Sequence, residues 1–309
     1  MTQSDHGHDL ARARLMLAGL CLSWGLTWPA MRIALTGIPP FSMRAASTFI
    51  GAVALLAAAR LQRKSIRLES VKVWLHVAVV SFFNIVAFSI FTTFAQLNTL
   101  TSRVTIIVYT MPIWAAVMAW LLLGERLDLV RGIALLSCCV GLGVLIYPVA
   151  EAGLPLGILL ALGASVGWAA GTIYMKWAKI HAEPFAIAAW QLVIGCIVLT
   201  ACTFVVEGSL HIAGAPASAL AGMAFSGLFG SGLAYLLWYS VIQILPAMTA
   251  SLGALSAPVI GVISSALILG ERPTTTDIMG FALIFAASAC VILKPAPVAS
   301  VKPKPAHPE

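Results

Sequence analysis

Two stretches of the chain match each other: PIWAAVMAWLLLGER at 112–126 and PVIGVISSALILGER at 258–272. In both, a glycine follows the opening proline by twelve positions, the residues between them are almost all apolar, and Glu-Arg comes next. The second stretch begins 146 residues after the first. A long segment that recurs within one chain indicates a duplicated structural unit.

The match continues toward the start of each unit. Tryptophans, small residues and a Met-basic pair recur together at an offset of 144 residues. Because these positions share one register, they are a stronger signal than any single run of small residues. The pairs are Gly19, Ser23 and Thr27 with Gly163, Gly167 and Gly171, Trp24 with Trp168, and Met31-Arg32 with Met175-Lys176.

The composition is that of a protein whose solvent is a lipid bilayer. Of 309 residues, 61% are hydrophobic and 9% are charged, against about 25% charged residues in soluble domains. A helix that crosses a bilayer needs about 20 apolar residues, and ten runs of about this length are present. They span approximately 11–34, 41–60, 73–97, 101–123, 129–149, 154–176, 184–206, 217–243, 246–269 and 277–293. We therefore predict an all-α membrane protein with ten transmembrane helices.

The basic residues predict the orientation of these helices, since lysine and arginine accumulate in cytoplasmic loops. If the N-terminus is cytoplasmic, 14 of the 18 basic residues lie on the cytoplasmic side. We therefore expect both termini in the cytoplasm, with a cytoplasmic tail at 1–10 and a proline-rich, disordered cytoplasmic tail at 294–309. The net charge of +7 follows from this bias, and nucleic acid is not an expected partner.

Five helices per unit make the duplication an inverted one. An odd number of crossings places the second unit in the membrane upside down relative to the first, so we predict two five-helix repeats, at 11–149 and 150–293. Glu125-Arg126 would then face the cytoplasm and Glu271-Arg272 the outside. Inverted repeats are typical of secondary transporters, because they allow a central site to open to either side in turn.

Ten helices in two such units, each with a P…LGE segment before its last helix, resemble the drug/metabolite transporter superfamily. Within it the chain is similar to the EamA-type proteins, and most to the YddG-type amino-acid exporters. The resemblance covers residues 11–293. It implies a central cavity lined mainly by the first, third, fourth, sixth, eighth and ninth helices of the chain, and a multi-pass protein of the bacterial inner membrane.

Aromatic and uncharged polar residues occupy the predicted membrane interior. Trp24 and Trp168 lie near mid-depth, away from the interfaces where belt tryptophans gather, so they either pack between helices or line a cavity. An amide at the depth of Asn84 is costly unless it faces protein, water or solute. The candidate substrate-binding residues are Trp24, Trp28, His76, Phe83, Asn84, Tyr109, Trp168, Tyr235 and Tyr239.

The charged inventory limits the mechanism. All eleven carboxylates fall in tails, loops or helix ends, and there is no phosphate-binding P-loop. We expect no enzyme activity, metal, cofactor or ATPase subunit. The residues suit export of amino acids, including aromatic or other bulky neutral ones, and of related metabolites, by alternating access and facilitated diffusion. The alternative is a proton-coupled multidrug or metabolite exporter of the same superfamily.

Overall fold

The computed structural model describes residues 3–124, 129–150, 155–180, 182–244 and 256–293. Within these ranges all regular structure is helical. Its elements are α1 (Gln3–Ala34), α2 (Pro40–Leu61), α3 (Val71–Ser81), η1 (Phe82–Ala87), α4 (Phe88–Asn98), α5 (Thr101–Val108), α6 (Met111–Leu123), α7 (Leu129–Ala150), α8 (Leu156–Ala178), α9 (Pro184–Val206), α10 (Ala217–Phe225), η2 (Ser226–Leu233), α11 (Ala234–Ile244), α13 (Ser256–Leu269) and α14 (Thr275–Leu293). The tail predicted at 294–309 and the Glu125-Arg126 pair lie outside the described residues.

Six of these helical stretches are long and apolar enough to cross a bilayer. They are Pro40–Leu61, Val71–Asn98, Thr101–Leu123, Leu156–Ala178, Pro184–Val206 and Ala217–Trp238. Shorter apolar stretches lie in α7, α13 and α14, at Gly132–Pro148, Ser256–Leu269 and Thr275–Cys290. The prediction of an all-helical protein with several membrane-compatible helices is confirmed, and the count of ten stays a prediction.

The repeated glycines end their helices in the same way. Gly124 follows α6 with φ of 69°, and Gly270 follows α13 with φ of 67°. This left-handed conformation is the common helix terminator, and glycine adopts it without the clash that a Cβ would cause. The glycine in both LGER segments therefore has a backbone role, and it ends the two matched helices as the sequence indicates.

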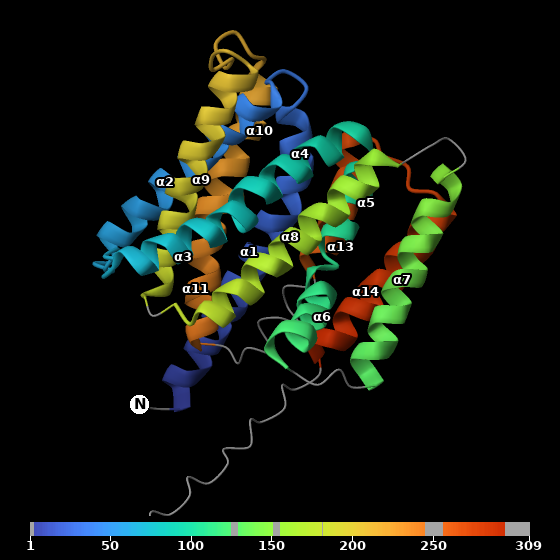
Figure 1. Cartoon of the computed structure of the whole chain (residues 1–309), viewed down its shortest axis with the longest axis horizontal. Helices are drawn as coiled ribbons and strands as arrows, with labels where there is room; N and C mark the ends of the chain where they lie inside the picture. Colours follow the sequence, from blue (N-terminus) through green and yellow to red (C-terminus); the bar gives the residue numbers. More distant parts are fainter. Residues whose placement is uncertain (1–2, 125–128, 151–154, 181, 245–255, 294–309) are drawn as a thin grey trace, which may run out of the picture.

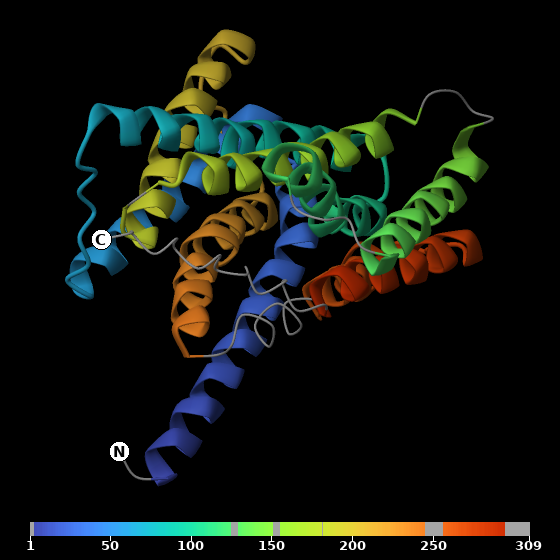
Figure 2. The ribbon, with the colours of Figure 1, turned by 60° about the horizontal axis from the view of Figure 1, so that its bottom comes forward.

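The helices pack in matching pairs across the two halves of the chain. α7 lies beside α14 on one flank, and α2 packs against α9 on the other (Figure 1; Figure 2). Between these flanks, α1 packs against α13 and against α10, η2 and α11. Its counterpart α8 packs against α5 and α6 and against α3, η1 and α4. The packing of α1 against α13, α10, η2 and α11 is thus matched by that of α8 against α6, α3, η1 and α4, whereas the counterpart of α5 lies outside the described residues.

Two π-helical segments also correspond. η1 begins at Phe82 and η2 at Ser226, which is again an offset of 144 residues. Each interrupts a long helix that is α-helical on both sides. π-helical turns are rare and occur often at functional sites. The glycine-rich run at 227–232 lies within η2.

The run predicted as one helix at 101–123 is broken in the middle. α5 ends at Val108 and α6 begins at Met111. Pro112 has no N–H to continue the helical ladder, and the N–H of Ile113 bonds to the carbonyl of Thr110, 2.9 Å away. The carbonyl of Tyr109 accepts instead from the Ser288 hydroxyl of α14, at 3.1 Å.

Candidate functional site

Three predicted site residues lie together where α1, α5 and α13 meet. Trp28 is buried, and Tyr109 packs against the hydrophobic cluster that contains it. Trp24 and Tyr109 both pack against the hydrophobic cluster that α1 forms with α11 and α13, and the Trp24 ring lies 5.9 Å from that of Trp238.

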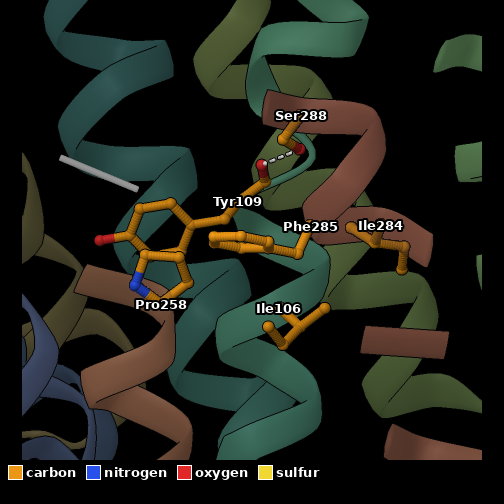
Figure 3. A pocket seen from close by; sticks show the side chains of 6 residues that line it. All are labelled: Ile106, Tyr109, Pro258, Ile284, Phe285 and Ser288. Atoms are coloured by element: carbon orange, nitrogen blue, oxygen red, sulfur yellow. Dashed lines mark hydrogen bonds between the residues drawn. The ribbon is translucent and has the colours of Figure 1, made fainter. Parts of the chain in front are cut away.

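A small cavity lies behind Tyr109, on the side of α14. It is lined by Ile106, Tyr109, Pro258, Ile284, Phe285 and Ser288 (Figure 3). Its volume is about 10 Å³, whereas one water molecule needs about 10–15 Å³ measured in this way. This space is too small for a metabolite, so the side of Tyr109 toward α14 is a packing surface.

A second group of predicted residues lies where α3 and η1 meet α8. His76 Nδ1 lies 2.8 Å from the Tyr174 hydroxyl, and the two ring centroids are 5.7 Å apart. Tyr174 was not among the binding residues predicted from the sequence. Its pairing with His76 joins positions 98 residues apart, and no short motif marks it.

Asn84 approaches the backbone of α8 closely. Its Oδ1 is buried and has no hydrogen-bond partner, and a Cβ added to Gly171 would overlap it. Phe83 lies at the same crossing, with its Cβ 2.9 Å from that added Cβ. One turn away on the same helix, a Cβ added to Gly167 would meet nothing within 4 Å. The contact between α8 and η1 is therefore tight at Gly171, whereas a Cβ at Gly167 would have room.

The remaining predicted residues are spread along α8 and α11. Trp168 is half-buried one residue after Gly167, and its carbonyl accepts from the Thr172 hydroxyl at 3.0 Å. Tyr235 packs against the cluster formed mainly by α2 and α9. Tyr239 belongs to α11, and its side chain lies outside the described residues. The structure thus brings together two separate groups, one around Tyr109 and one around Asn84.

A buried polar network links α6 to α8 near the helix break. The Thr110 hydroxyl lies 2.8 Å from that of Ser165, and it accepts from the Trp114 indole at 2.9 Å. This network was not predicted from the sequence. The one signal for it is Pro112, which marks the helix break where the Thr110 hydroxyl can bond to other side chains. These groups are satisfied by one another, which favours a structural role in holding α6 against α8.

The carboxylates gather at helix ends rather than in the middle of the bundle. At one end, Glu271 accepts from the N–H groups of Thr101 and Ser102 at 2.6 and 2.9 Å. Glu207 accepts in the same way from Phe41 and Ser42 at 2.8 and 2.9 Å. A carboxylate at a helix N-terminus is stabilised by the helix dipole and the unpaired N–H groups. Glu271 thus caps α5 and not the helix that follows it in the chain.

The same end carries an ion pair and a larger cavity. Arg103 donates to both Asp277 oxygens, at 2.5 and 3.0 Å. We call this part of the bundle, defined by Glu207, Glu271 and Asp277, the capped end. A cavity of about 430 Å³ opens there. It is lined by Arg32, Leu97, Asn98, Thr99, Leu100, Arg103, Pro155, Gly157 and Ile158.

Comparison with known proteins gives the family. The model of the EamA-like transporter family matches the chain twice, at residues 11–147 and 155–293. The chain belongs to the EamA-like transporter family. It is therefore a member of a membrane transporter family that acts on small molecules, and the predicted superfamily is confirmed.

Individual proteins resemble the chain over most of its length. Two Bacillus subtilis (strain 168) proteins, both described as uncharacterized transporters, are similar. YoaV is 27% identical over 89% of this chain and 94% of its own length, and YvbV is 29% identical over 91% of each. A protein of known crystal structure, 20% identical, has a TM-score of 0.63 over 91% of this chain and 96% of its own, which shows the same fold.

Proposed function

We propose that this EamA-family transporter exports amino acids, including aromatic or other bulky neutral ones, and related metabolites, by facilitated diffusion. The observation that carries the proposal is the chemistry of the interior. Rings, hydroxyls and an amide gather around Tyr109 and Asn84, while each described carboxylate side chain belongs to a loop or a helix end. Ring faces bind apolar side chains and ammonium groups, and hydroxyl and indole groups donate to carboxylates.

The Asn84 amide is a candidate contact for the solute. Its oxygen has no partner, and a polar group without a partner at membrane depth is costly enough to suggest a function. The open space beside Gly167 lies one turn from the Asn84 contact, and Trp168 follows directly. We propose that the solute occupies this space, between the ring of Trp168 and the side chains of η1.

Alternating access fits the paired architecture. In this proposal ten helices cross the membrane as two inverted five-helix units, with both termini in the cytoplasm of a bacterium and the capped end outside. The two π-helical segments and the break between α5 and α6 are the points at which the helices would bend, because each interrupts regular helical hydrogen bonding. Movement at corresponding points in the two units would open one side as it closes the other.

Proton-coupled drug export is the alternative, and one contact favours it. His76 and Tyr174 form a hydrogen-bonded pair in the interior, and histidine is the side chain suited to a change of protonation near neutral pH. Proton coupling by this route predicts that His76→Gln abolishes uphill transport and leaves downhill transport intact. In the leading proposal the pair only positions α3 against α8.

Substitution of the interior tryptophans tests the amino-acid proposal. Trp24→Ala and Trp168→Ala should each lower the uptake of labelled phenylalanine into proteoliposomes several-fold and affect alanine less, because the lost contact is with the aromatic ring. Trp120→Ala is the matched control, since Trp120 is 46% exposed on α6 and is not among the predicted site residues. Normal phenylalanine uptake by both interior variants would contradict the assigned site.

A further inference from the structure

The cavity at the capped end is lined by two guanidinium groups. Arg32 comes from the last turn of α1, and Arg103 from α5. None of the nine described residues that line the cavity is acidic. Its volume of about 430 Å³ lies within the 300–1,000 Å³ that is usual for small-molecule sites. Size and lining together suit a small anionic group.

The three carboxylates of the capped end each have hydrogen-bond partners within the protein. Asp277 neutralises Arg103 through two hydrogen bonds. Glu207 and Glu271 are held by the N–H groups at the starts of α2 and α5. Of the two arginines that line the cavity, only Arg103 has a carboxylate partner among the described residues, so Arg32 supplies the positive charge that is not compensated there.

Arg32 is held in place by a neutral group. Its Nη1 donates to the carbonyl of Gln96 at 2.6 Å, and the Gln96 amide donates to the carbonyl of Trp28 at 3.0 Å. These bonds fix one edge of the guanidinium between α1 and α4, and no carboxylate in the described part of the chain bonds to it. A guanidinium has five N–H donors and binds carboxylates in a two-pronged geometry, so the remaining donors can serve a ligand.

Arg44 of α2 is a buried arginine whose partners are neutral. Arg44 is 9% exposed and donates to the hydroxyls of Thr92 and Thr93, which are neutral. Among the described residues it contacts no carboxylate. Arg44 does not line the cavity, so the attraction of the cavity for a small anion rests on Arg32 at its wall.

We infer that this cavity is a site for a small carboxylate, with Arg32 as the group that binds it. The inference rests on the proposed function, because it assigns to Arg32 the carboxylate of the solute as the solute enters or leaves at the capped end. The counterpart of Arg32 in the second half is Lys176, in the last turn of α8. A basic residue therefore occupies corresponding positions in both units. The site would favour amino acids over cationic amines.

The charge of the cavity can be measured without transport. The six native cysteines of the full-length chain are changed to serine, and a single cysteine replaces Asn98, which is exposed and lines the cavity. The protein is held in phosphatidylcholine nanodiscs. The cysteine's rates of modification by an anionic and a cationic methanethiosulfonate are compared. Arg32→Gln should lower the anionic-to-cationic rate ratio roughly fivefold, as expected for loss of one nearby charge, and Arg32→Lys should preserve it.

Arg272→Gln is the matched control. Arg272 is exposed at the same end and does not line the cavity, so its loss changes the net charge equally but should leave the ratio nearly unchanged. A cysteine at Leu97, which is also exposed and lines the cavity, is the second reporter if the first chain does not fold. Equal ratios with and without the Arg32 guanidinium would overturn the inference.

Ligand protection then separates the possible sources of the anion. Phenylacetate should slow modification in chains that keep Arg32, and phenylethylamine should not. Protection by added phosphatidylglycerol with no effect of phenylacetate would identify a lipid headgroup and overturn the solute assignment. Protection by phenylacetate without amino-acid flux would support the site and contradict the proposed function. Amino-acid flux without protection would overturn the inference alone.

Discussion

Gly171→Ala tests the close crossing of α8 and η1, on which the candidate site depends. An added Cβ would overlap the Asn84 Oδ1 and would lie 2.9 Å from the Cβ of Phe83. The amide can rotate away, but the Phe83 Cβ is fixed to the backbone of η1. The two helices must therefore separate by several tenths of an ångström, which also disturbs the side chains proposed to contact the solute.

The size of the effect follows from two opposing terms. Alanine is favoured over glycine inside a helix by about 1 kcal/mol, whereas overpacking of a tight contact costs about 1–3 kcal/mol. Gly167→Ala is the matched control, because it gains the same helical preference and its Cβ meets nothing within 4 Å. The difference in unfolding free energy between the two variants therefore reports the clash alone and should be about 1–3 kcal/mol, with the Gly171 variant less stable.

The assay is thermal unfolding of both variants in the same detergent at one scan rate, since membrane proteins often unfold irreversibly. At about 2–4 °C per kcal/mol for large domains, Gly171→Ala should melt roughly 4 °C below Gly167→Ala. Adding Asn84→Ala should recover part of this gap, because it removes the amide but leaves Phe83 in place. Equal melting temperatures for the two glycine variants would refute the proposed crossing.

Two further predictions concern the helix ends and the topology. Glu271→Ala should lower the stability by about 1–2 kcal/mol through loss of the α5 cap, whereas Glu69→Ala, at an exposed position before α3, should change it by less than about 0.5 kcal/mol; equal effects in chemical denaturation would contradict the capping role. In intact cells, single cysteines in the 61–72 and 124–131 loops should react only from the cytoplasm, and cysteines at 270–276 only from outside, and labelling of 124–131 and 270–276 from the same side would refute the inverted repeat.

The sequence predicted those features of the fold that depend on local pattern. The helical class follows from the long apolar runs, and the ends of α6 and α13 follow from Gly124 and Gly270, whose backbone geometry favours glycine. The break at Pro112 also has a local cause, because the missing N–H acts on the nearest turn.

Contacts between distant segments were not predictable from one sequence. Tyr174 meets His76, and Glu271 meets the start of α5, only because the folded helices bring positions 98 and 170 residues apart together. The π-helical segments reflect packing as well as local preference, since their sequences, FFNIVA and SGLFGSGL, have little in common. The bond from Arg32 to the carbonyl of Gln96 likewise joins positions 64 residues apart.

The central claim is that the chain moves amino acids down their own gradient without a proton. The most direct measurement is the flux of labelled phenylalanine into proteoliposomes that contain the purified chain, with and without an imposed pH gradient. We predict rapid downhill flux that stops when inside and outside concentrations are equal and is little changed by the pH gradient. Accumulation of phenylalanine above the outside concentration when a pH gradient is applied, or no flux above that of empty liposomes, would contradict the claim.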